Sequence, residues 1–152
     1  MEGKVVGIFI ATGAKASVVA RTEAHAVPGK GIEGDRYFTH TGSFSDKPGD
    51  GREITLIEFE SVEAVKRECG IEIQPGESRR NVVTRGVALN HLVGREFQVG
   101  RVRLKGIRLC DPCEHLEGLT KRGILSALIH RGGLRANVLS EGTFKVGDSI
   151  SV

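Results

Sequence analysis

The chain has 152 residues, which is the length of one ordinary domain and leaves little room for two. Hydrophobic residues make up 39% of it, enough for a core, so the composition excludes a wholly disordered protein. The net charge of +3 is too small to indicate a partner, and the 5% of aromatic residues gives few rings for stacking nucleic-acid bases. The 21 glycines follow no short period, which excludes collagen and indicates many turns.

The first residues of the chain and the number of cysteines indicate the cellular compartment of the protein. The apolar stretch at residues 5–11 is far shorter than the ~20 residues that span a bilayer, and Glu2 lies where a signal peptide would carry positive charge. Three cysteines is an odd number, so disulfides could not pair every thiol. We therefore expect a single cytoplasmic domain over residues 1–152 with reduced thiols and no membrane partner.

Short β-rich runs alternate with glycines along the chain. The predicted strands are Lys4–Ile10, Glu53–Ile57, Asn81–Thr84, two runs within Arg95–Leu109 that break at Val99-Gly100, Leu134–Leu139 and Thr143–Val152, with a turn at 140–142. Helical spacing of apolar residues predicts helices at Glu58–Cys69, ended by Gly70, and at Leu119–Ile129. A polar, glycine-rich stretch at 39–52 is predicted to be a mobile lid or rim. The fold class is mostly β with a few short helices (α+β), in a small mixed or antiparallel barrel.

Cys110-Asp111-Pro112-Cys113 is the first candidate for chemistry. Half of a zinc site, a redox pair and two buried thiols are all alternatives, but no second paired motif supplies further zinc ligands. A single reactive thiolate at Cys113 fits well, because Arg108 and His115 are near enough in sequence to lower the pKa of a thiol. Cys69 falls on the apolar stripe of a predicted helix, so we expect it in the core.

Positive charge gathers in one block. Between Arg79 and Arg108 the chain carries eight Lys or Arg residues against the single acid Glu96. In Arg79-Arg80-Asn81 two guanidinium groups and an amide precede a strand, a combination suited to holding phosphate or another planar anion. Arg101, Arg103 and Lys105 alternate with apolar residues and project from one face of a strand, where an ordinary solvated surface is the simpler interpretation.

Two further charged clusters contain glycines. One is Asp35-Arg36 after Gly31 and Gly34, and the other is His130 to Arg135 around Gly132-Gly133. Helix capping explains part of the second cluster, yet three basic or titratable groups around a diglycine exceed what a cap needs. We expect the missing side chains at these glycines to let backbone approach a bulky anionic ligand.

Taken together in this order, these motifs resemble the MOSC domain, the module named after the C-terminal part of molybdenum cofactor sulfurase. The resemblance is carried by Gly31–Arg36, Ile54–Glu58, Glu77 with Arg80-Asn81, Leu92-Val93-Gly94 with Phe97, Pro112-Cys113, Arg131–Arg135 and Val146–Asp148. No pyridoxal-phosphate desulfurase segment accompanies them, so the chain is similar to the standalone form, and pyridoxal phosphate is only a family-level association. Cys110 matches a subset of relatives with paired cysteines, and Tyr37 stands where many relatives carry a His.

The resemblance implies a closed or partly closed mixed β-barrel of the MOSC type with one reactive cysteine. In the family this cysteine carries sulfur as a persulfide or ligates the molybdenum of a bound pterin cofactor. By this matching, Cys113 is the catalytic residue and metal ligand, and the cofactor-binding residues are Arg80, Asn81, Arg131, Arg135, Asp35 and Arg36. The implied partners are the molybdenum cofactor (molybdopterin) or a sulfur donor or acceptor protein.

Three functions remain in competition. A molybdenum-cofactor-binding or sulfur-carrier domain leads. An enzyme that reduces N-hydroxylated substrates would need a separate electron-transfer partner, because the chain has no flavin, haem or nicotinamide motif. A non-enzymatic module whose basic face binds nucleic acid or an acidic protein is the alternative from another class, and scarce aromatic residues disfavour nucleic acid.

Overall fold

The computed structural model describes residues 2–13, 16–38, 53–110 and 131–152. Its strands are β1 (Glu2–Ile10), β2 (Val19–Arg21), β3 (Glu23–Val27), β4 (Gly31–Ile32), β5 (Ile54–Glu58), β6 (Val82–Arg85), β7 (Glu96–Val99), β8 (Val102–Leu109), β9 (Leu134–Val138), β10 (Gly142–Lys145) and β11 (Ser149–Ser151). The helices in this part of the chain are α1 (Phe59–Cys69) and two 3₁₀ turns, η1 (Pro75–Ser78) and η2 (Leu89–Leu92).

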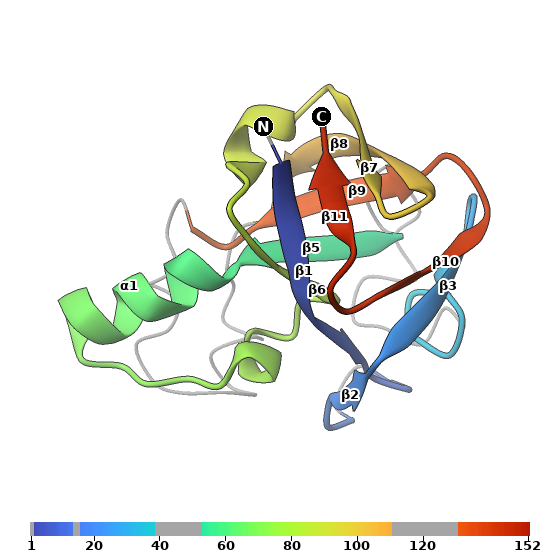
Figure 1. The fold of residues 1–152 in the computed structure, drawn as a ribbon. Coiled ribbons are helices and arrows are strands. Elements are labelled where there is room, and N and C mark those ends of the chain that lie inside the picture. Colours follow the sequence, from blue (N-terminus) through green and yellow to red (C-terminus); the bar gives the residue numbers. More distant parts are fainter. Residues whose placement is uncertain (1, 14–15, 39–52, 111–130) are drawn as a thin grey trace.

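Seven of the strands close into a barrel (Figure 1). Around the ring the order is β1, β11, β7, β8, β9, β5, β6 and back to β1, while β2 extends the sheet outward from β1. All neighbours in the ring are antiparallel except β5 and β6. A ring with an odd number of strands cannot alternate direction throughout, so one parallel pair is required. This confirms the predicted mixed, mostly β barrel.

The parallel pair explains the position of α1. Parallel neighbours cannot be joined by a tight hairpin and need a longer crossover, which here runs through α1 and η1. Val62 and Val65 of α1 pack against Ile57 and Val83 on the outside of the barrel. The helix ends at Gly70, whose φ of 70° is left-handed, as the sequence predicts.

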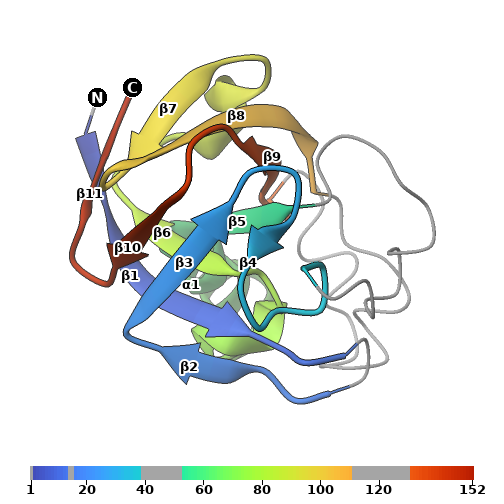
Figure 2. The same cartoon turned by 90° about the vertical axis from the view of Figure 1, so that its right-hand side faces the viewer.

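A second, three-stranded sheet with the order β10, β3, β4 lies beside the barrel (Figure 2). Its buried residues join those of the barrel in one continuous core. Along β8 the alternation is regular, with Val102 and Leu104 inside and Arg103 and Lys105 outside. Core residues from the second sheet are Ala24, Ala26, Ile32 and Phe144.

Most of the described elements follow the sequence prediction, but the predicted strand Thr143–Val152 is divided into two strands, β10 and β11. Residues 134–139 and 143–152 do not pair across a turn, because β9 pairs with β5 and β8 whereas β10 pairs with β3. Residues 143–152 form two strands in different sheets. Strands β2, β3 and β4 were not predicted, because their small and charged residues carry little β signal. The predicted helix at 119–129 and the stretch at 39–52 lie outside the described residues.

The expectation for Cys69 was also wrong, because its side chain is exposed. Cys69 is the last residue of α1, one turn beyond Val65. Ile73, from the segment that turns back after the helix, is buried in the same apolar cluster as Val65. Helical periodicity predicts which face of α1 is apolar but not where the packing surface ends. In the part of the chain that the structure describes, no helix has the length and apolarity needed to cross a membrane.

Candidate functional site

Polar side chains are buried where β1 and β8 end and where β6 and β9 begin. Apart from Thr84, the buried polar residues of the described chain belong to this region: Asp35, Arg36, Thr55, Ser78, Arg79, Arg80, Asn81 and Arg135. Four of them are arginines and one is acidic. Burying a guanidinium is unfavourable unless hydrogen bonds or opposite charge compensate it, so such a gathering indicates a site for an anion.

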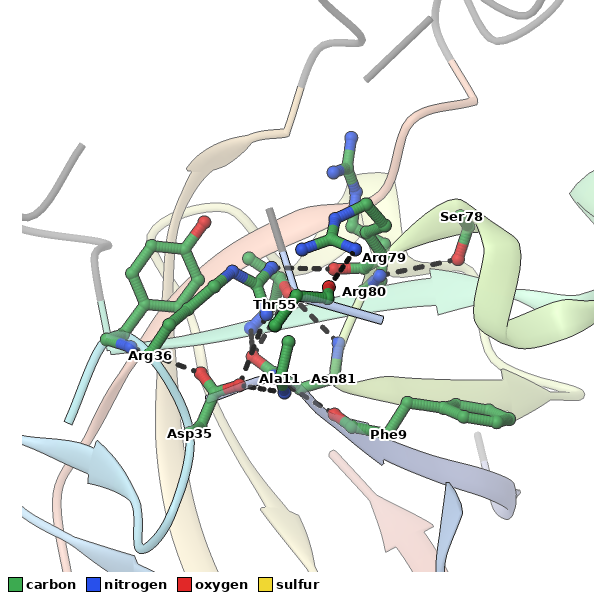
Figure 3. Close-up of polar contacts among 11 residues, drawn as sticks. Phe9, Ala11, Asp35, Arg36, Thr55, Ser78, Arg79, Arg80 and Asn81 are labelled. Atoms are coloured by element: carbon green, nitrogen blue, oxygen red, sulfur yellow. Dashed lines mark hydrogen bonds and ion pairs between the residues drawn. The ribbon is translucent and has the colours of Figure 1, made fainter. Parts of the chain in front are cut away.

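Asp35 and Arg36 link the end of β1 to the segment before β6 (Figure 3). The buried carboxylate of Asp35 accepts hydrogen bonds from the Ala11 N–H at 3.1 Å, from Arg36 Nη1 at 3.2 Å and from the Tyr37 N–H at 3.4 Å. Arg36 Nη2 donates to the Arg79 carbonyl at 2.9 Å. The pair, predicted from sequence to contact a cofactor, therefore also fixes the backbone that carries the neighbouring arginines.

Arg79 is the only non-glycine residue of the described chain with a positive φ, 61°. It terminates η1, and its Nη1 donates to the Ala16 carbonyl at 2.8 Å. Burial, together with the nearby positive charge of Arg36, lowers the pKa of Arg79 from its ordinary value. Two guanidinium groups thus lie close together in a partly desolvated place, which favours binding of an anion.

Arg80 lies at the junction of β8 and β9. Its Nε donates to the Gly132 carbonyl at 2.7 Å and its Nη2 to the Cys110 carbonyl at 3.4 Å. The Cys110 N–H in turn donates to the Gly133 carbonyl at 2.7 Å. These described contacts of Arg80 are with neutral carbonyl oxygens, so they satisfy two of its N–H groups without cancelling the positive charge.

Asn81 joins three strands. Its Oδ1 accepts from the Thr55 N–H at 3.0 Å and from Thr55 Oγ1 at 3.1 Å, while its Nδ2 donates to the Phe9 carbonyl at 3.1 Å. The Asn81 backbone carbonyl also accepts from the Phe9 N–H at 2.7 Å. Asn81 is fully buried, so these bonds give it a clear role in holding β1, β5 and β6 together. Its predicted contact with a cofactor stays a prediction. Nothing in the sequence pointed to Thr55, since threonine is common in strands.

Arg135 and Arg131 lie in different surroundings. Arg135 lies on β9 directly opposite Thr55 and Arg108, and it is 9% exposed. Arg131 forms an ion pair with Glu68 in the last turn of α1, and this hydrogen bond lowers the pKa of Glu68. Arg131 Nη1 is buried and has no hydrogen-bond partner among the described residues. The structure thus brings most of the predicted set together and leaves Arg131 beside α1.

Gly31 and Gly133 make close backbone approaches, though to a strand of the protein itself. A Cβ atom at Gly133 would lie 1.9 Å from the Leu56 carbonyl oxygen, and one at Gly31 would lie 2.2 Å from that of Glu53. Both glycines also have φ near 105°. We expected these positions to admit a ligand, but their small size is explained by the packing of β4 and β9 against β5.

Cys113 lies outside the described residues, so its predicted role as catalytic residue and metal ligand stays a prediction. Its neighbour in the motif, Cys110, is a free thiol that is 1% exposed. Within the described ranges, no group of three or more His, Cys, Asp or Glu side chains is placed to hold a metal ion.

The basic residues between Arg79 and Arg108 do not form one surface in the structure. Arg79 and Arg80 are buried in the site, whereas Arg85 forms an ion pair with Glu63 at 3.3 Å and stacks over Phe59. The alternating basic residues of β8 are exposed on the outside of the barrel, as their spacing predicts.

Comparisons with known proteins agree with this fold. The MOSC domain family matches residues 44–151. Among solved structures, YuaD from Bacillus subtilis has a TM-score of 0.80 at 19% identity, covering 99% of this chain and 94% of that one. YiiM from Geobacillus stearothermophilus has a TM-score of 0.70 at 16% identity, covering 98% of this chain and 74% of that one.

YiiM from Escherichia coli has a TM-score of 0.67 at 15% identity, covering 97% of this chain and 68% of that one. No curated protein matches the sequence significantly. At these identities the solved structures establish the fold alone, and the family match over residues 44–151 covers most of the sequence. On this basis the chain belongs to the MOSC domain family.

Proposed function

We propose that this protein binds a molybdenum cofactor or carries sulfur, with Cys113 as the thiolate that ligates the metal or holds a persulfide. Membership of the MOSC family supports the chemistry. The observation that carries the proposal is the position of Arg80, whose buried guanidinium contacts the carbonyls of Cys110 and Gly132.

Chain connectivity relates this cation to the thiol. Cys113 follows Cys110 by three residues, and three residues of extended chain span at most about 11 Å. The Cα atom of Cys113 is therefore within about 11 Å of the residue whose carbonyl accepts a hydrogen bond from Arg80. A nearby cation favours the thiolate over the thiol, and the thiolate is the form that binds soft metals and sulfane sulfur.

The residues present fit an anionic group. Arg36, Arg79, Arg80 and Arg135 are each at most 9% exposed, and Asp35 is the buried acid of the described cluster. Arg131, which pairs with Glu68 beside α1, has a buried Nη1 without a hydrogen-bond partner in the described chain. When bound, the molybdenum cofactor would supply redox or sulfur chemistry at the metal. The arginines would bind its phosphate, and Asp35 would keep Arg36 and the Arg79 backbone in position.

The test is expression in cells with an intact molybdenum-cofactor pathway, followed by metal analysis and intact-mass measurement. We expect molybdenum, or a reductant-labile adduct of about 32 Da, which is one sulfur atom, because both depend on a thiolate. Either should be lost in Cys113→Ser. Arg80→Gln should lower the occupancy while leaving the thiol in place.

Cys69→Ser is the matched control, because Cys69 is an exposed thiol on α1 that would collect sulfur nonspecifically. The proposal fails if the wild type carries neither molybdenum nor the adduct. It fails equally if Cys113→Ser retains as much as the wild type, or if Cys69→Ser loses as much as Cys113→Ser.

A further inference from the structure

The outer face of β8 carries an exposed row of basic side chains that the proposed function does not use. Arg101 immediately precedes the strand, and Arg103 and Lys105 follow at alternate positions, so all three point away from the core. Arg108 continues the row and is also exposed. We call these four residues the β8 basic stripe.

A bulge keeps the stripe continuous. Lys105 pairs with Asn137 and Gly106 with Ala136, but Arg108 then pairs with Arg135, so Ile107 is an extra residue without a partner on β9. Without the bulge, strict alternation would turn Arg108 toward the barrel interior. With it, Arg108 stays on the outer face, opposite Arg135 of the buried cluster. The stripe therefore runs along β8 up to the candidate site.

The neighbouring strands do little to neutralise the stripe. Among the residues that pair with β8 on β7 and β9, Glu96 is the single acid, and its carboxylate is 4.0 Å from Arg103 Nη1. Both side chains of that pair are more than half exposed, so the pair contributes little. Alternate residues on a strand are about 6.8 Å apart, less than the Debye length of about 8 Å at physiological salt. The charges of the stripe thus act together on a partner.

We propose that the β8 basic stripe is the docking surface for an acidic protein partner, which it brings to the candidate site. An acidic surface or an extended acidic segment would pair with the stripe charge by charge and would be steered to it over long range. A single-stranded nucleic acid is disfavoured because such ligands need exposed rings to stack on. The aromatic rings of the described residues are buried or half-buried, and Phe97, beside the stripe on β7, is 3% exposed.

The probe is a fluorescein-labelled peptide of alternating Glu and Ser, with binding followed by fluorescence anisotropy at about 50 mM and about 150 mM salt. The test variant is the triple charge reversal Arg101→Glu, Arg103→Glu and Lys105→Glu. Arg108 is left intact because it lies opposite Arg135. We expect the triple variant to bind at least about tenfold more weakly, and wild-type binding to weaken as salt rises.

The matched control makes the same change in net charge elsewhere. Lys4, Arg21 and Lys145 are exposed basic residues on β1, β2 and β10, and reversing all three should weaken binding by less than about twofold. Circular dichroism is used to check that both variants fold. The proposal is overturned if the control loses as much affinity as the test variant, or if wild-type binding is undetectable or insensitive to salt.

Competition with a single-stranded DNA oligonucleotide tests the other class of partner. Tighter binding of the oligonucleotide than of the peptide at the same salt, lost in the stripe variant, would overturn the acidic-protein proposal in favour of nucleic acid. The measurement uses protein without cofactor, and Cys113→Ser should bind the peptide as well as the wild type does. Failure of the docking proposal is therefore separate from failure of the proposed function.

Discussion

Arg79 concentrates backbone strain and positive charge at a single residue. A side chain in the left-handed region costs on the order of 1 kcal/mol, and Asn or Gly is the usual choice there. The strained backbone is held from both sides, since the Arg79 N–H donates to the Gly76 carbonyl at 3.0 Å and its carbonyl accepts from Arg36 Nη2. Strain of this kind persists where the residue's side chain is needed, here beside Arg36 and Arg80.

Comparing two substitutions of Arg79 separates the strain from the charge. Both Arg79→Ala and Arg79→Gly lose the hydrogen bond to the Ala16 carbonyl, but only glycine relieves the left-handed backbone. We expect the free energy of unfolding, measured by urea denaturation, to be about 1 kcal/mol higher for Arg79→Gly than for Arg79→Ala. Equal stability of the two variants would mean that the backbone at this position is not strained.

At the scale of elements, the site depends on how closely β9 approaches β5. Arg80 reaches the Gly132 carbonyl at 2.7 Å, just before β9 begins. The next residue, Gly133, lies against the Leu56 carbonyl on β5 with no room for a Cβ atom. One glycine thus brings the start of β9 and the Arg80 contact into place. Glycine is needed at position 133 because of Leu56 on β5, which lies 77 positions earlier in the chain. Local sequence patterns therefore could not reveal this need.

Gly133 and Gly147 allow a matched test of this approach. Both have φ near 100°, but nothing lies within 4 Å of a Cβ atom built at Gly147. Gly147→Ala should therefore lower the free energy of unfolding only by the backbone strain, about 1–2 kcal/mol. Gly133→Ala should lower the free energy of unfolding by more than about 3 kcal/mol, because β9 must also move away from β5. The close approach is refuted if the two variants show the same loss in free energy of unfolding.

For the whole molecule, closure of the barrel depends on strands from the two ends of the sequence. β11 pairs with both β1 and β7, and Ile150 faces Gly3 on one side and Val99 on the other. Without β11 the ring would be an open sheet with two exposed edges. The termini are therefore expected to be part of the cooperative core.

Ile150→Ala tests this closure. Ile150 is fully buried, so the substitution should lower the free energy of unfolding by about 2–4 kcal/mol in a single transition. Val146, which is 42% exposed, is the control, and Val146→Ala should change the stability by less than about 0.5 kcal/mol. Far-UV circular dichroism is the appropriate measurement, since the chain has no tryptophan. If the Ile150→Ala variant is no less stable than Val146→Ala, the barrel does not depend on the packing of β11 between β1 and β7.

Short stretches of the sequence were enough to predict the local features of this protein. Alternation along β8, the apolar face of α1 and the stop at Gly70 depend on residues close together in the chain, so local pattern was enough to predict them. The guanidinium pair Arg79-Arg80 was likewise visible as an anion-binding combination. Short strands separated by turns predicted a small barrel, and the resemblance to the MOSC family, spread over many short motifs, carried the prediction that the barrel is of the MOSC type.

The three-dimensional fold sets which of these residues are neighbours. It placed β10 against β3 and not β9, left Cys69 exposed, and divided one basic block into a buried cluster and an exposed stripe. Each of these outcomes depends on which surface covers a residue and which strand lies beside it. Those neighbours come from distant parts of the chain, and strand pairing leaves little local trace because side-chain alternation is the same whichever partner a strand has.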